Sequence, residues 1–132
     1  MRLLLGREPH RLEAVHPVII EELLSLAADR KTVAVTTIIE MLASLHDEGR
    51  SSPYLVKLSH SPLWELKPMS RGGERGGCRV YLFLLPTGEA GIVNCEVKKP
   101  DAKASQSKLA VGLRTITLFP YTTLFRSRKS VV

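Results

Sequence analysis

Three short runs between residues 63 and 99 decide the fold of this chain. They are Leu-Trp-Glu-Leu-Lys (63–67), Cys-Arg-Val-Tyr-Leu-Phe-Leu-Leu (78–85) and Ile-Val-Asn-Cys-Glu-Val-Lys-Lys (92–99). Each run is largely apolar, and segments rich in Gly, Pro and Ser separate them, which predicts β-strands joined by turns. A Lys or Arg also occurs in each run, and a basic side chain on a sheet face requires an anionic partner. The pattern therefore predicts a sheet with one face that binds an anion.

The residues before these runs have a helical period. Spacings of i, i+3, i+4 and i+7 predict a first helix from Pro17 to about Ala28, after irregular residues 1–16. A second helix is expected over Thr32–Glu48, ended by Gly49. The short turn between them predicts an αα-hairpin. The expected apolar stripes are Ile20, Leu23, Leu24 and Ala27 in the first helix, and Val35, Ile38, Ile39, Leu42 and Leu45 in the second.

The remaining elements complete a small α+β domain. Tyr54–Leu58 predicts a further short strand, and residues 68–77 predict a flexible connection. Asp101 is expected to cap a short helix that runs to about Val111. The predicted fold is an N-terminal αα-hairpin packed on a small antiparallel sheet of about four strands, with a short C-terminal helix.

The two-residue period of a strand predicts which side chains share a face. If one sheet face packs on the helices, the polar residues of the strands gather on the other, unless a β-bulge shifts a register. In the last predicted strand, Val93, Cys95 and Val97 are expected to project from one face, and Asn94, Glu96 and Lys98 from the other. The predicted polar face comprises Lys57, Glu65, Lys67, Arg79, Tyr81, Asn94, Glu96 and Lys98.

Composition narrows the function classes. The net charge is +6, and it is uneven: residues 1–50 carry six Lys/Arg against eight Asp/Glu, and residues 51–132 carry thirteen against five. A basic half indicates a polyanionic partner, nucleic acid first and an acidic protein second, or else a solubilising charge with a basic tail. No apolar run reaches membrane-span length and none forms a signal peptide, so we expect a cytoplasmic protein. Cys78 and Cys95 are expected to be buried and reduced, and neither a metal nor a cofactor is expected.

The order of these motifs over about Pro17 to Val111 resembles the RelE/HigB toxins, in particular the phage-derived HigB-like branch of the RelE/ParE superfamily. The resemblance rests on two helices followed by Tyr-Leu-Val-Lys-Leu (54–58), Leu-Trp-Glu-Leu-Lys (63–67), Cys-Arg-Val-Tyr-Leu-Phe (78–83) and Val-Lys-Lys (97–99). It implies the toxin of a type II toxin–antitoxin system, a ribosome-dependent mRNA endonuclease that inhibits translation. The implied partners are the ribosome, mRNA and a helix-turn-helix antitoxin. A ParE-like inhibitor of DNA gyrase and a catalytically inactive antitoxin-binding module remain alternatives.

The resemblance also suggests catalytic residues, of which Arg79 is the first. A guanidinium can hold a phosphate through two hydrogen bonds; the alternative is an ion pair with Glu65 or Glu96. Lys67 and Lys98 are the other catalytic candidates, with a solvated strand end and a plain surface lysine as the alternatives. Glu65 itself is expected to be structural and to orient the cations.

Four residues are candidates for RNA binding. Lys57 would line the groove and neutralise backbone charge, or be an ordinary surface lysine. Tyr81 could stack on a base or pack in the core. Arg71, in the glycine-rich connection, and Lys99 could reach RNA or be simply exposed. His60, in a loop, could transfer protons or be a surface histidine.

The domain is expected to end near Leu113. From Thr115 to Ser127 the sequence is similar to translated adapter sequence. Residues 1–113 are therefore predicted to form a single domain, and residues 114–132 a non-native or disordered tail.

Overall fold

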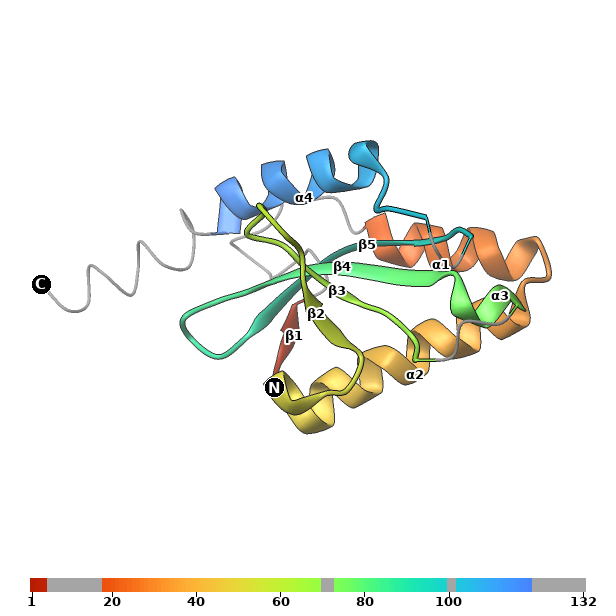
Figure 1. Ribbon diagram of the computed structural model, residues 1–132, viewed down its shortest axis with the longest axis horizontal. Helices are drawn as coiled ribbons and strands as arrows, with labels where there is room; N and C mark the ends of the chain where they lie inside the picture. The colour runs from red at the N-terminus through yellow and green to blue at the C-terminus, as the bar shows by residue number, and fades with distance from the viewer. Residues whose placement is uncertain (5–17, 70–72, 100–101, 120–132) are drawn as a thin grey trace, which may run out of the picture.

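The chain forms an α+β structure, as the sequence predicts (Figure 1). The computed structural model describes residues 1–4, 18–69, 73–99 and 102–119. The predicted extent of the second helix is confirmed. The first helix is described from Val18 to Ala28, and Pro17, its predicted first residue, lies outside the described residues. The helices are α1 (Val18–Ala28), α2 (Thr32–Glu48), the single turn α3 (Gly73–Gly76) and α4 (Gln106–Phe119), and η1 (Gly49–Ser51) is a 3₁₀ turn.

Five strands form one mixed sheet, in the order β1-β5-β4-β3-β2. The four predicted strands are present and pair antiparallel with one another. The expectation of irregular structure at the N-terminus is wrong for β1, which pairs parallel with β5. Two leucines give no alternation to detect, so only their pairing with β5 makes them a strand. The strands are β1 (Leu3–Leu4), β2 (Leu55–Lys57), β3 (Trp64–Leu66), β4 (Cys78–Leu84) and β5 (Ala90–Val97).

Helices α1 and α2 cover one side of the sheet, here called the hairpin face. Its sheet residues are Leu66, Cys78, Val80, Leu82, Ala90, Ile92 and Cys95, which form one core with the two helices. Both cysteines are buried, as predicted, and they form no disulfide with each other. The helical stripes are rotated from the predicted ones: Ile38 is fully buried, whereas Ile39 is 53% exposed and Leu24 is 66% exposed. Each helix has apolar residues on more than one of its faces, so the helical period alone does not predict which face is buried.

A β-bulge in β5 changes the predicted alternation. Tyr81 pairs with Asn94, but the next residue of β4, Leu82, pairs with Ile92, so Val93 is the extra residue. Val93 therefore packs in a different cluster from Cys95, on the opposite side of the sheet. The prediction that Val93 shares a face with Cys95 is wrong, because a bulge inserts one unpaired residue and reverses the alternation beyond it.

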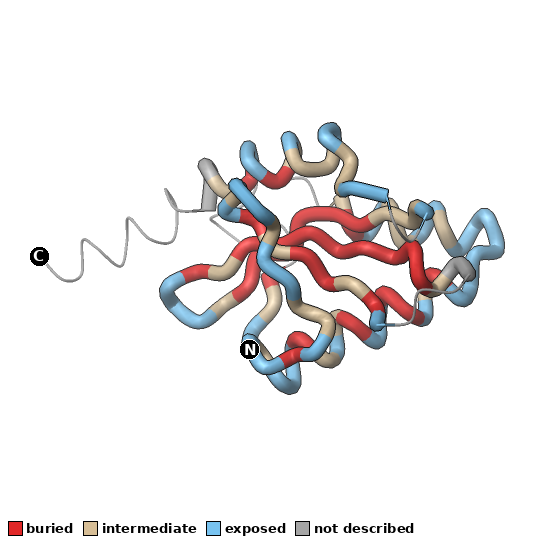
Figure 2. The backbone as a smooth tube through the Cα atoms, viewed as in Figure 1, coloured by how far each residue is buried: buried red, intermediate tan, exposed pale blue. Residues whose placement is uncertain are grey.

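Helix α4 covers part of the other side of the sheet, here called the α4 face. Its apolar portion consists of Leu4, Leu63, Phe83, Leu85 and Val93, against which Leu109, Val111 and Ile116 of α4 pack. In Figure 1, α4 and α2 lie on opposite sides of the sheet, and Figure 2 shows β4 and β5 buried between them. The α4 face is thus half apolar and half polar, rather than a continuous polar groove.

The C-terminal helix differs from the predicted one at both ends. It begins at Gln106 and ends at Phe119, and Asp101, the predicted cap, lies outside the described residues. The predicted boundary after Leu113 falls inside the helix, where Thr115 is buried and Ile116 packs on the sheet. Residues 120–132 lie outside the described residues.

A close approach of backbone fixes the polar half of the α4 face. The Lys98 N–H donates to the Gly77 carbonyl at 2.9 Å. A Cβ atom on Gly77 would lie 1.7 Å from the Lys98 carbonyl oxygen, so no side chain fits there. Gly77 therefore lets the start of β4 lie against the end of β5, next to Arg79 and Glu96.

No helix among the described residues is both long and apolar enough to cross a membrane.

Candidate functional site

A cleft of about 550 Å³ opens on the polar half of the α4 face. The floor comes from β3 and β4, one wall from the β2–β3 turn, and the other from the segment that leads into α4. Two of the three predicted catalytic residues, Arg79 and Lys67, line this cleft. The lining residues are Leu58, Ser59, Ser61, Glu65, Lys67, Arg79, Ala102, Lys103, Ala104, Gln106 and Leu109.

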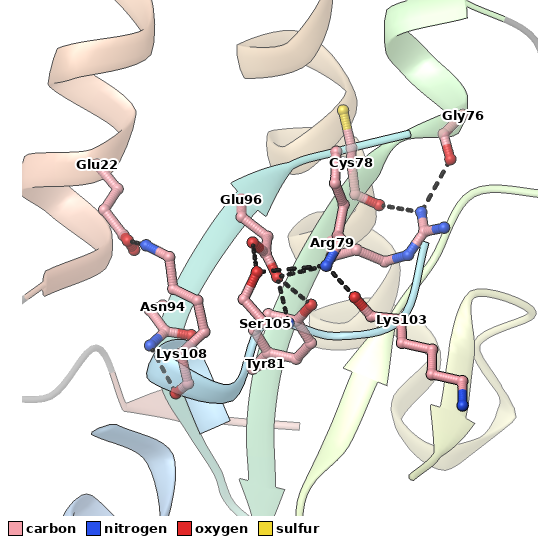
Figure 3. Close-up of polar contacts among 11 residues, drawn as sticks. Glu22, Gly76, Cys78, Arg79, Tyr81, Asn94, Glu96, Lys103, Ser105 and Lys108 are labelled. Atoms are coloured by element: carbon pink, nitrogen blue, oxygen red, sulfur yellow. Dashed lines mark hydrogen bonds and ion pairs between the residues drawn. The ribbon is translucent and has the colours of Figure 1, made fainter. Parts of the chain in front are cut away.

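Arg79 is held in the floor of the cleft by backbone carbonyls. Its Nη1 donates to the carbonyl oxygens of Gly76 and Cys78, both at 2.8 Å, and the residue is 2% exposed (Figure 3). These bonds fix the plane of the guanidinium relative to the turn before β4. A guanidinium has five N–H donors, so these two bonds leave its charge in place at the cleft.

Glu96 is the centre of a hydrogen-bonded cluster beside the cleft. Its carboxylate accepts from Tyr81 Oη at 2.5 Å, from Ser105 Oγ at 2.6 Å and from the Ser105 N–H at 3.2 Å. Figure 3 shows these three side chains converging above β4 and β5. Burial would raise the pKa of Glu96, but the hydrogen bonds from Ser105 and Tyr81, with the charge of Lys98, hold it below its ordinary value. The cluster ties the segment before α4 to the sheet.

Lys98, the third predicted catalytic residue, belongs to this cluster and does not line the cleft. Its Nζ lies 3.7 Å from Glu96 Oε2 and donates to Ser105 Oγ at 3.3 Å and to the Lys103 carbonyl. The ammonium is therefore occupied by groups of the protein itself.

Tyr81 is also part of the cluster, and its ring is fully buried. Burial and the hydrogen bond to Glu96 raise the pKa of its hydroxyl. The ring has no exposed side on which a base could stack. Core packing, the alternative left open by the sequence, describes this position.

Lys57 lies on the other side of the sheet from the cleft. Residues paired directly across two antiparallel strands project from the same face, and Lys57 pairs with Trp64, whereas Val56 pairs with Glu65. The Lys57 ammonium lies 5.9 Å from the Trp64 ring centre and donates to the carbonyls of Leu58 and Ser61. The prediction that Lys57 joins the polar face is wrong, because β2 is so short that its own alternation does not fix its register against β3.

The remaining predicted residues are dispersed. Lys67 is half-buried in the cleft, and the described residues give its ammonium no hydrogen bond or ion pair. Lys99 is exposed after the end of β5. His60 is exposed in the β2–β3 turn, with a left-handed φ of 58°. Arg71 lies outside the described residues.

Glu65 is a residue of the cleft whose burial the sequence analysis did not predict. It is 8% exposed, lines the cleft, and is the Cα partner of Tyr81 across β3 and β4. Burial raises its pKa, and the charges of Arg79, Lys67 and Lys98 oppose that rise only in part. No described residue donates a hydrogen bond to its carboxylate, and that Glu65 is structural and orients the cations stays a prediction. The signal available in the sequence was its strand position between Trp64 and Leu66, which predicts an inward-facing carboxyl.

Neither a metal site nor a known relative identifies the chemistry of the cleft. Within the described part of the chain, no group of three His, Cys, Asp or Glu side chains is placed to hold a metal ion. No family model matches the sequence, and no curated protein matches it either.

Proposed function

We propose that this protein is the toxin of a type II toxin–antitoxin system and acts as a ribosome-dependent mRNA endonuclease that blocks translation. The observation that carries the proposal is the cleft, in which a buried arginine, a lysine without a partner among the described residues and a buried carboxyl line one space. The resemblance of residues 17–111 to the RelE/HigB toxins supplies the reaction.

The reaction requires the 2′-hydroxyl of one nucleotide to attack the adjacent phosphate in line. Negative charge increases on the phosphate in the transition state, and preorganised cations stabilise it. Arg79 supplies a cation whose orientation is fixed by two carbonyls, and Lys67 supplies a second in the same cleft. Holding the mRNA so that the hydroxyl and the phosphate are aligned contributes a further large part of the rate.

The proposal assigns partners as well as an activity. The mRNA would enter the cleft on the α4 face while the toxin is bound to the ribosome in the cytoplasm. A helix-turn-helix antitoxin would bind the protein and keep it inactive. Exposed Lys103 lines the cleft and would neutralise phosphates along the strand, and Lys99, exposed after the end of β5, would extend this role outside the cleft.

Expression of the full chain from a tightly controlled promoter in a bacterium, followed by mapping of new mRNA 5′ ends, tests this function. We expect cuts inside translated frames that disappear when translation is blocked. Growth arrest without such cuts would contradict the nuclease and point to a target such as gyrase. Absence of arrest would identify an inactive module that binds only its antitoxin.

A further inference from the structure

Two carboxyl groups on the α4 face have opposite environments. Glu96 accepts three hydrogen bonds and lies 3.7 Å from a lysine ammonium. Glu65 is more deeply buried, yet it receives no hydrogen bond from the described residues. A pair of titratable groups whose surroundings drive their pKa values apart is the usual arrangement of an acid–base site.

The environment of Glu65 is costly for the fold. A buried polar group without a hydrogen bond loses its hydration and gains nothing in return. Among the described residues, Asn94 Oδ1 is the one fully buried side-chain oxygen or nitrogen without a hydrogen bond. The carboxylate oxygens of Glu65 also lack a hydrogen bond, so they are not fully buried and remain in contact with the cleft. The lone pairs of Glu65 are therefore directed toward whatever occupies the cleft.

The cations beside Glu65 favour an anionic occupant. Lys67 follows two residues later and lies in the same cleft, Arg79 lies in the neighbouring strand, and Lys103 lies on the opposite wall. A phosphate held by these cations would place the sugar attached to it against the only carboxylate that lines the cleft within the described residues. A carboxylate that accepts hydrogen bonds suits a hydroxyl donor such as a ribose 2′-OH.

We propose that Glu65 is the general base of RNA cleavage, the group that removes the proton from the attacking 2′-hydroxyl. This inference rests on the proposed nuclease function. In the step, the 2′ oxygen forms a bond to phosphorus, and the bond from phosphorus to the 5′ oxygen of the next nucleotide breaks. The 2′ proton moves to Glu65, and the leaving 5′ oxygen takes a proton from water. The products are a 2′,3′-cyclic phosphate and a 5′-hydroxyl, after which Glu65 returns its proton to solvent.

The inference predicts how the rate depends on pH. A base acts in its ionised form, so cleavage should rise with pH through the pKa of Glu65, which burial raises above the ordinary glutamate value. The groups that face Glu65 are Arg79 and Tyr81 of β4, Glu96 of β5, Lys67 and Lys98 just after the ends of β3 and β5, and Lys103 of the segment before α4. Arg79 keeps its charge throughout, and hydrogen bonds keep Glu96 ionised to lower pH. His60 lies between Ser59 and Ser61, which line the cleft, so it requires its own control.

The test is single-turnover cleavage of mRNA on programmed ribosomes by the full chain, from pH 5 to pH 8. We expect Glu65→Gln to lower the rate by about 10²- to 10⁴-fold, the range typical of a lost general base, and to abolish the acid limb. His60→Asn keeps the left-handed backbone at position 60, which Asn tolerates, and should keep both the rate and the acid limb. Glu40→Gln, a partly exposed carboxyl of α2 paired with Arg75, is the matched surface control.

The outcomes separate the two proposals. If the wild type does not cut ribosome-bound mRNA, the nuclease function fails. If the wild type cuts and Glu65→Gln cuts within about threefold of it with the same acid limb, the base assignment is overturned and the function stands. Melting curves check folding; if Glu65→Gln is unfolded at the assay temperature, Glu65→Asp decides, with a lower plateau rate and a retained acid limb expected. An unchanged plateau in Glu65→Asp would overturn the assignment.

Discussion

The two faces of the sheet are built on different principles. The hairpin face is apolar along β3, β4 and β5, and α1 and α2 cover it with one continuous core. The α4 face divides into an apolar half under α4 and a polar half that contains Arg79, Glu65 and Glu96. One face therefore serves stability alone, while the other combines stability with a charged cleft. Four substitutions test this division between the two faces.

The largest effect on stability is expected on the hairpin face. Ile38→Ala removes a fully buried side chain of α2 and should lower the free energy of unfolding by about 2–5 kcal/mol. The adjacent Ile39→Ala is the control, since Ile39 is 53% exposed and its loss should cost at most about 0.5 kcal/mol. Urea denaturation measures both. Equal losses would mean that the helix is rotated from its described orientation.

Among these four substitutions, the largest effect on activity is expected on the α4 face. Arg79→Ala removes a preorganised cation and should lower the mRNA cleavage rate by about 10²- to 10³-fold, equivalent to about 3–4 kcal/mol of transition-state stabilisation. Binding to the antitoxin should persist. Arg50→Ala, an exposed arginine of η1, is the control and should cleave at the wild-type rate. Full cleavage by Arg79→Ala would remove this residue from the site.

A smaller effect is expected from Ser105→Ala, which removes one hydrogen bond to Glu96. Hydrogen bonds hold the pKa of Glu96 below its ordinary value, so they stabilise the fold above the unfolded-state pKa. That contribution is lost as the pH falls through the folded-state pKa. At neutral pH the variant should lose about 1–2 kcal/mol, and its difference from the wild type should shrink in acid. Thermal melting at several pH values measures this, with exposed Ser107→Ala as control. A pH-independent difference would contradict the role of Glu96.

The smallest effect is expected from Lys57→Ala. Lys57 lies on the side of Trp64 and away from the cleft, so cleavage should be unchanged and stability altered by no more than about 0.5–1 kcal/mol, the size of an exposed cation–π contact. Lys67→Ala, in the cleft, is the matched comparison and should slow cleavage. A nuclease defect in Lys57→Ala larger than that in Lys67→Ala would reverse the assignment of the two lysines.

The parts of the fold predicted correctly are those with strong local signals. Thr32–Glu48 has a long helical period and a terminal glycine, and its bounds agree with the structure. The apolar runs Cys78–Leu85 and Ile92–Lys98, limited by turns, predict two strands, and the structure has them at Cys78–Leu84 and Ala90–Val97. Arg79, Lys67 and Glu65 lie on one face as their positions in the strands predict. These features depend on neighbours in the sequence, which is why periodicity reveals them.

The parts predicted wrongly depend on contacts between distant residues. The sequence predicts the wrong face for Lys57 because the register of a three-residue strand is fixed by β3 and not by its own residues. Val93 changed face because of a bulge that has no signature in the run Ile-Val-Asn-Cys. Leu3–Leu4 became a strand only through its pairing with Ala90 and Gly91.

Local periods and composition are enough to predict an α+β chain with two helices, four antiparallel strands and a basic C-terminal half. Which polar side chains meet depends on how these elements pack. It placed Lys98 and Tyr81 in the hydrogen-bonded cluster around Glu96, and it left Glu65 without a hydrogen bond from the described residues in the cleft with Arg79. The physical reason is that a side chain's role depends on the groups that solvate or pair with it, and in a sheet those groups come from other strands and from α4.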